Sequence, residues 1–126
     1  MAQTVAIEAD VTFNKNGVLT SGITHALDAA GIVLVNAGDY KVTFSVSGTG
    51  VSQMALFVNG TTLVPGTIYG SGAGTQQNTG LAIVTLAAGD VLTLRSHSSS
   101  AAVGLASIIG GPQANTNASV AIEKLD

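Results

Sequence analysis

The two histidines and the serines and carboxylates near them are the residues whose types could do acid–base or nucleophilic chemistry. His97 lies in the run "RSHSSS", and Asp28 follows shortly after His25. A hydrolase triad needs a nucleophile, a histidine and an acid within hydrogen-bond reach. Neither histidine is part of a Gly-x-Ser-x-Gly turn, and in a strand the serines that flank His97 would point away from it. We therefore expect no catalytic residues and no enzyme activity.

The same histidines and carboxylates such as Glu8, Asp10 and Asp90 are the candidate metal ligands. The sequence contains no His-x-His or His-Glu-x-x-His spacing and no Asp-rich calcium loop. It has no cysteine, which excludes disulfides and thiolate sites. We predict no metal site and no cofactor, and a calcium ion at a subunit junction is the form of metal binding that stays open.

The stretch "GSGAGTQQNTG" (70–80) has the glycine spacing of a phosphate-binding loop. A dinucleotide fingerprint is Gly-x-Gly-x-x-Gly followed by a helix, whose N-terminus meets the pyrophosphate. Gly70 and Gly72 fit this pattern, but Thr75 stands at the third glycine position and the apolar run after it is typical of a strand. We interpret the stretch as a connection between strands, in which Gln76, Gln77 and Asn78 satisfy backbone groups.

The composition argues against two classes of partner, nucleic acids and membranes. The chain of 126 residues is 9% charged with a net charge of −3, and its four basic residues are scattered along the sequence, which argues against nucleic-acid binding. No apolar run approaches the roughly 18 residues of a membrane span, so we expect no membrane insertion. A monomer with so little charge would expose much apolar surface, and such a surface usually marks an interface.

Alternation of apolar and polar residues is the dominant pattern. In "GDYKVTFSVS" (38–47) the apolar residues recur at every second position, which predicts a half-buried strand. Asn59-Gly60 stands between apolar runs and predicts a hairpin, because a type I′ turn needs positive φ at both central residues. Residues 81–96 are interpreted as two strands joined near Gly89-Asp90, and residues 116–125 as a C-terminal strand.

Helical patterns are scarce, and "SAAVGLASIIGGPQ" (100–113) is interpreted as an extended, packed connection. Many short strands between Gly-rich turns predict an all-β sandwich or jelly roll. No linker-like stretch divides the chain, so we expect a single domain over residues 1–126.

Two segments, "AAGIVLVNAG" (29–38) and "GLAIVTLAAG" (80–89), are apolar at both odd and even positions. A strand that is apolar on both faces must be covered on both faces. We expect a second copy of the chain to supply one cover; the alternative is a central strand covered within one copy. The residues predicted to form a trimer interface are Ile32, Leu34, Phe57, Leu81, Ile83, Val120 and Ile122.

Two of these patterns resemble a known family. "GDYKVTF" (38–44) is similar to the Gly-x-Tyr-x-Phe strand of the complement-type and tumour-necrosis-factor-like jelly rolls, with Val42 in place of the middle aromatic residue. "LAAGDVLTL" (86–94) is similar to that family's Leu-x-x-Gly-Asp-x-Val-x-Leu turn, although here Val91 directly follows the Asp.

From about Leu56 onward, the chain resembles the C-terminal domain of BclA-type collagen-like glycoproteins of spore-forming bacteria. The segments that carry the resemblance are "LFVNGTTLVPGTIYGSGAGTQQNTG", "AAGDVLTLRSHSS" and "IIGGPQANTNASVAIEKL". The resemblance implies an all-β, ten-stranded antiparallel jelly-roll sandwich, assembled as a homotrimer. It also implies a place at the end of a collagen-like stalk in filaments of the exosporium, the outer spore surface.

Two functions follow as hypotheses. The first is a structural head that nucleates and holds the trimer of a collagen-like stalk. The alternative is an adhesin or lectin-like module that binds host surface proteins or glycans. The sequence has two tyrosines and no tryptophan, so it offers few of the aromatic side chains that stack on sugars.

Overall fold

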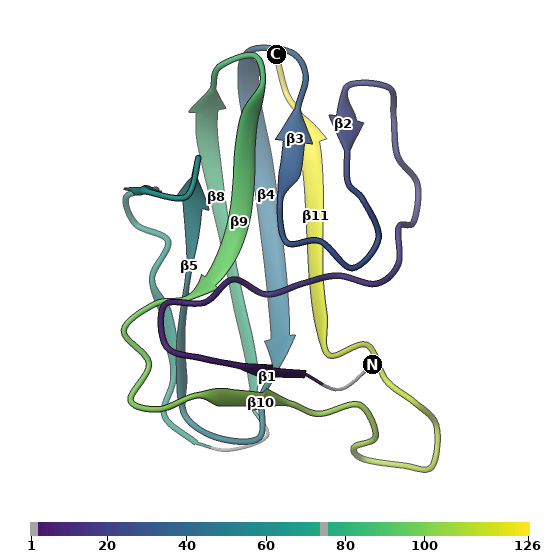
Figure 1. Ribbon diagram of the computed structural model, residues 1–126, viewed down its shortest axis with the longest axis vertical. Helices are drawn as coiled ribbons and strands as arrows, with labels where there is room; N and C mark the ends of the chain where they lie inside the picture. The colour runs from purple at the N-terminus through teal and green to yellow at the C-terminus, as the bar shows by residue number, and fades with distance from the viewer. Residues whose placement is uncertain (1–2, 74–75) are drawn as a thin grey trace.

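The computed structural model describes residues 3–73 and 76–126 and is built from strands alone within these ranges (Figure 1). The eleven strands of the described residues are β1 (Gln3–Val5), β2 (Ile23–Thr24), β3 (Ile32–Leu34), β4 (Gly38–Ser47), β5 (Ser52–Val58), β6 (Thr62–Leu63), β7 (Tyr69–Ser71), β8 (Gln77–Leu86), β9 (Asp90–Ser96), β10 (Val103–Leu105) and β11 (Ala118–Lys124). The all-β expectation is confirmed. The family plan has ten strands, and the difference comes from very short strands such as β2 and β6.

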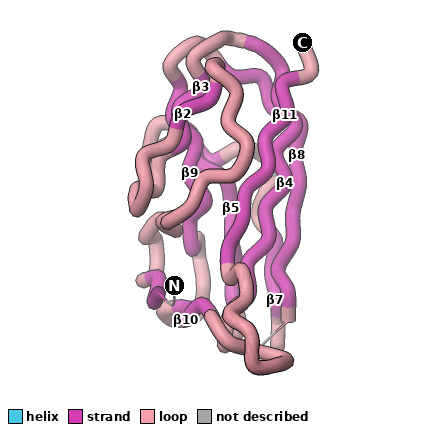
Figure 2. The backbone as a smooth tube through the Cα atoms, turned by 90° about the vertical axis from the view of Figure 1, so that its right-hand side faces the viewer, coloured by secondary structure: helices cyan, strands magenta, loops and turns pink. Residues whose placement is uncertain are grey.

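The strands form two packed layers. One layer is a six-stranded sheet in the order β2-β3-β9-β5-β6, with β7 paired to β5. The other is a three-stranded sheet in the order β11-β4-β8, and a separate pair joins β1 to β10. All pairings are antiparallel. Figure 2 shows β2, β3 and β9 on one side and β11, β4 and β8 on the other. Among the described residues, no helix is long and apolar enough to cross a membrane.

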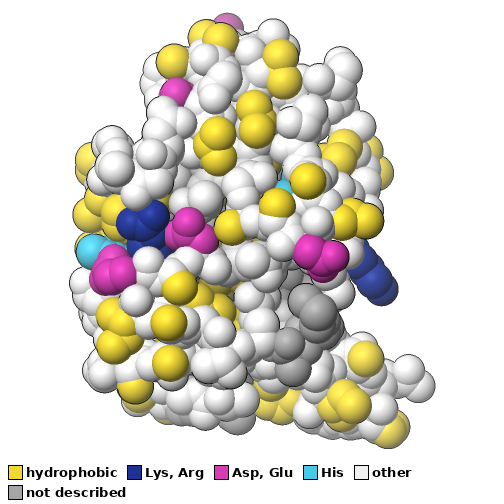
Figure 3. Space-filling model, viewed as in Figure 1, with side chains coloured by type: hydrophobic (Ala, Val, Ile, Leu, Met, Phe, Trp, Pro, Cys, Tyr) yellow, Lys and Arg dark blue, Asp and Glu magenta, His cyan; other side chains and the backbone are white. Residues whose placement is uncertain are grey.

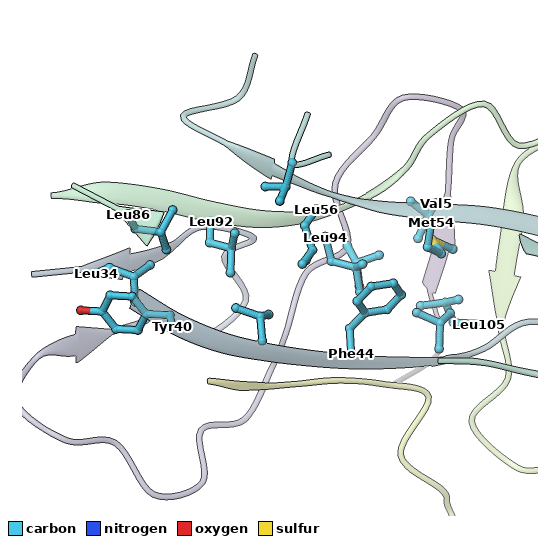
Figure 4. Packing of buried hydrophobic residues seen from close by; sticks show 14 of the residues in the cluster. Val5, Leu34, Tyr40, Phe44, Met54, Leu56, Leu86, Leu92, Leu94 and Leu105 are labelled. Carbon is cyan, nitrogen blue, oxygen red and sulfur yellow. The ribbon is translucent and has the colours of Figure 1, made fainter. Parts of the chain in front are cut away.

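The alternating sequence of β4 explains how the core forms. Its even positions, from Tyr40 to Val46, are buried, and its odd positions from Lys41 to Ser45 are exposed or half-buried. Figure 4 shows the ring of Tyr40 beside Leu34 of β3 and the ring of Phe44 pointing from β4 toward Leu94 of β9. Burial of each such side chain contributes about 1.5–3 kcal/mol. The Tyr40 hydroxyl has a hydrogen-bond partner, because it donates to the carbonyl of Asn36 at 2.6 Å.

The predicted turns are confirmed. Asn59 and Gly60 have φ angles of 54° and 78°, as a type I′ turn between β5 and β6 requires. Gly89 has a φ of 83° and joins β8 to β9, where Asp90 accepts a hydrogen bond from the amide of Ala87 at 2.8 Å.

Two segments differ from the simplest interpretation. The apolar run 29–38 contributes only the three-residue strand β3, whose Leu34 is fully buried within the chain. The extended connection 100–113 contains the short strand β10, because Val103 to Leu105 pair with the N-terminal strand β1.

Candidate functional site

Each histidine contacts oxygen atoms of carboxylate, amide or carbonyl groups. The Nδ1 atom of His97 contacts a carboxylate oxygen of Glu8 at 2.8 Å, and the hydroxyl of Ser96 donates instead to Ser99. His25 contacts Asn16 and the carbonyl of Ala29. Within residues 3–73 and 76–126, no hydrogen bond joins either histidine to a serine hydroxyl.

The described carboxylates and histidines do not cluster as the ligands of a metal ion would. No group of three or more of them lies close enough to hold an ion within the part of the chain that the structure describes. The charged residues that do gather are two pairs, Arg95 with Asp10 at 2.8 Å and His97 with Glu8 at 2.8 Å. Figure 3 shows basic, acidic and histidine side chains together on one side of the face that carries β9.

The glycine-rich stretch 70–80 joins β7 to β8 and takes part in both strands. The side chain of Asn78 donates to the carbonyl of Tyr69 at 2.8 Å, as predicted for this amide. The Gln76 and Gln77 side-chain oxygens accept from the hydroxyls of Ser71 and Ser45, rather than bonding the backbone. Gly74 and Thr75 lie outside the described residues.

One surface of the three-stranded sheet combines two exposed large apolar side chains with hydroxyl-bearing and charged residues. We call it the outer sheet face; it consists of the residues of β11, β4 and β8 that point away from the core. The register places Ala121, Thr43 and Leu81 in one row and Glu123, Lys41 and Ile83 in the next. The remaining members are Ser119, Ser45, Thr79, Asp39 and Thr85.

Leu81 and Ile83 stand at the centre of β8 on this face. Their exposed fractions are 51% and 66%. The other exposed large apolar residues of the described chain lie outside strands, whereas these two project side by side from a regular strand. An adjacent apolar pair on an otherwise hydroxyl-rich sheet is typical of a contact surface.

Three more predicted interface residues line a groove at the other side of β11. Val120 and Ile122 are half-buried on β11, and Ile32, on β3 of the other sheet, is 8% exposed. The groove has a volume of about 730 Å³ and is also lined by residues 12–20 and 114–119. We call this the edge groove.

The last two predicted residues have little surface left to offer a partner. Leu34 is 0% exposed and belongs to the core of its own chain. Phe57 is 5% exposed because the guanidinium of Arg95 lies 4.0 Å from its ring centre and the His97 ring packs edge-on at 5.1 Å. This cover of Phe57 joins residues far apart in sequence, and the sequence carries no pattern that would have predicted it.

The fold and these surfaces can now be set against known proteins. The model of the BclA C-terminal domain family matches residues 1–126. The chain belongs to this family. A search of the curated proteins finds no match for this BclA C-terminal domain.

One solved structure supports the same fold for this BclA C-terminal domain. The globular domain of zebrafish complement 1qA protein aligns with a TM-score of 0.55 and 15% identity, over 82% of this chain and 90% of that one. This likeness shows a complement-type jelly roll, as the sequence patterns predicted. A family 35 carbohydrate-binding module from Clostridium thermocellum aligns with a TM-score of 0.43 and 16% identity, over 99% of each chain.

Proposed function

We propose that this domain is the trimeric head of a collagen-like protein of the exosporium, and that it holds three stalk chains in register. Membership of the BclA C-terminal domain family and the complement-type fold support the proposal. The observation that carries it is the exposure of Leu81 and Ile83 on the outer sheet face.

The physical reason for association is the water-exposed surface of these two side chains. Moving a half-exposed leucine or isoleucine out of water contributes about 1 kcal/mol, and a trimer would repeat this gain in every copy. The neighbouring Thr43 and Ala121 are small, so a second copy could approach the sheet closely. The charged members of this face, Asp39, Lys41 and Glu123, would stay at the solvent-exposed rim of the contact, because burying an unpaired charge is costly.

A cyclic trimer needs two different surfaces, because the patch on one copy meets another patch on the next. The outer sheet face and the edge groove are such a pair, on opposite sides of β11. We assign Leu81 and Ile83 to the first surface and Val120 and Ile122 to the second. Ile32, Leu34 and Phe57 are left out because their own chain covers them.

The proposed stalk role follows from chain entropy. A collagen triple helix requires three chains in register, and bringing their ends together is costly. A head that trimerises raises the effective concentration of the attached ends to about the millimolar range. Gln3, at the start of the described chain, lines the edge groove, so a stalk joined there would begin at the proposed subunit contact.

Fusion to a short Gly-X-Y stalk tests this role. The stalk should refold to a triple helix faster, and melt at a higher temperature, when joined to the wild-type head than when joined to a head carrying Leu81→Ser and Ile83→Ser. Circular dichroism of the triple helix is the measurement. Ile108→Ser is the matched control, since Ile108 is 64% exposed and lies outside both surfaces. Equal refolding with all heads would reject the stalk role.

A further inference from the structure

Both histidines of the chain contact residues in the N-terminal part of the molecule. We call residues 3–24 the N-terminal arm; it runs from β1, along the edge of β9, through the loop 14–20 and into β2. His97 holds the arm at Glu8, and His25 holds the loop 14–20 at Asn16.

Two oxygen atoms face the two ring nitrogens of His25. Its Nε2 faces the carbonyl oxygen of Ala29 at 2.7 Å, and its Nδ1 faces the side-chain oxygen of Asn16 at 2.6 Å. The orientation of the Asn16 amide is fixed by its nitrogen, which donates to the carbonyl of His25 at 2.8 Å. A neutral imidazole carries one N–H and can satisfy one of the two oxygens, whereas the imidazolium satisfies both.

The contacts of His97 gain from a ring charge in a different way. The Glu8 carboxylate accepts from the Nδ1 of His97 at 2.8 Å and from the amide of Ser98 at 2.9 Å. A hydrogen bond between two charged groups is roughly twice as strong as one between neutral groups.

The backbone shows that this second contact holds strained residues. Glu8 and Ser98 both have a φ of 62°, in the left-handed region that side chains other than glycine seldom adopt. Each costs on the order of 1 kcal/mol in that conformation. Weakening the contact between Glu8 and His97 would let both residues relax, so the strain favours release of the arm.

We propose that protonation of His25 and His97 tightens the N-terminal arm on the jelly roll, so that the arm is held more firmly in mild acid than in mild base. Charged groups of both signs lie near the two histidines, and those on the segments that contact His25 are Lys15 and Asp28. Near His97 they are Glu8 on the arm and Arg95 on β9, whose charge is paired with Asp10. Within residues 3–73 and 76–126, His25 forms no ion pair, and neither does the neighbouring Lys15.

The contact between His97 and Glu8 also weakens when the Glu8 carboxylate becomes protonated in acid. The hydrogen bond from His97, with the amide of Ser98 next, lowers the pKa of the Glu8 carboxyl below its ordinary value. The carboxylate therefore keeps its charge to a lower pH than an ordinary glutamate, and loses it only in stronger acid. The arm should be held best at pH values between the loss of this charge and the loss of the histidine protons.

Hydrogen exchange read by mass spectrometry tests the proposal on the full chain. Segments 6–12 and 14–22 are compared at about pH 5.5 and about pH 8, on either side of the ordinary titration of histidine, each after correction for intrinsic exchange. Loss of one hydrogen bond predicts that the loop 14–22 opens about fivefold more at the higher pH. His25→Gln should abolish this difference for 14–22 and leave it for 6–12, and His97→Gln should do the reverse.

Exposed substitutions keep the test decisive if a histidine variant fails to fold. Asn16→Ala removes the oxygen that faces Nδ1 and should abolish the difference for 14–22, whereas Lys15→Gln in the same loop should leave it intact. Equal opening at both pH values in the wild type, or a difference that survives both His25→Gln and Asn16→Ala, overturns the proposal. The measurement needs neither a stalk nor a trimer, so its failure is independent of the proposed function.

Discussion

Gly80 on β8 lies directly opposite Phe44 on β4, and the Phe44 ring occupies the space that a side chain at position 80 would need. A Cβ atom there would stand 2.6 Å from Cζ of Phe44 and would also meet the ring of Tyr69. The two rings pack edge-on with centres 5.7 Å apart. The glycine thus allows β8, which carries the outer sheet face, to lie close over an aromatic pair.

Gly80→Ala should lower the free energy of unfolding by about 1–3 kcal/mol, because two packed rings would have to move. Gly70→Ala on β7 is the matched control, since its nearest contact would be Gln53 Cγ at an ordinary 3.6 Å. Urea unfolding measures both variants. Similar stabilities for the two would refute the steric account of Gly80.

Asn59 joins the turn between β5 and β6 to the start of β9. Its side chain donates to Asp90 at 3.0 Å and accepts from the amide of Val91 at 2.9 Å. Asn59→Ala loses both bonds and places alanine at positive φ, so we expect a destabilisation of about 1–2 kcal/mol. Asn59→Gly keeps the turn conformation and should cost about half as much by thermal unfolding. A glycine variant as unstable as the alanine variant would speak against the conformational part.

The planar guanidinium group of Arg95 contacts three groups at once. Its Nε donates to Asp10 at 2.8 Å, its terminal nitrogen donates to the carbonyl of Gly60 at 2.9 Å, and its plane lies over Phe57. Lysine cannot keep all three contacts, so Arg95→Lys should cost about 1–2 kcal/mol in urea unfolding. Lys15→Arg, at an exposed loop position, should change the stability by less than about 0.5 kcal/mol. No loss in Arg95→Lys would show that the charge alone suffices.

Glu8 predicts how stability changes in acid. Since its pKa is lowered in the folded chain, chiefly by the hydrogen bond from His97, the carboxylate contributes stability above its ordinary value of 4.5. That contribution is lost as the pH falls through the lowered folded value. The urea midpoint of the wild type should fall more steeply than that of Glu8→Gln between about pH 5 and pH 3. Parallel curves would contradict the role of Glu8.

Local patterns predicted most of the strands because each pattern has a local physical cause. The alternation in 38–47 predicted β4 with the bounds that the structure has. Asn59-Gly60 correctly predicted the hairpin that joins β5 to β6. The C-terminal alternation likewise predicted β11.

Local patterns could not predict the contacts between segments that are distant in the sequence. The pairing of β1 with β10 and the Asp10–Arg95 ion pair join residues that are far apart along the chain, and no spacing rule connects them. Burial differed in the same way between two runs that looked alike. Leu34 is covered by its own chain, whereas Leu81 and Ile83 lie on the face of the three-stranded sheet that points away from the core.

Light scattering coupled to gel filtration, at micromolar concentration, tests the central claim most directly. The wild-type chain should have three times the mass of one chain, and the double substitution Leu81→Ser with Ile83→Ser should have the mass of one, while Ile108→Ser stays trimeric. Circular dichroism should show that all three remain folded, since the changed side chains are exposed. A wild type with the mass of a single chain, or a trimer that survives the double substitution, would contradict the account.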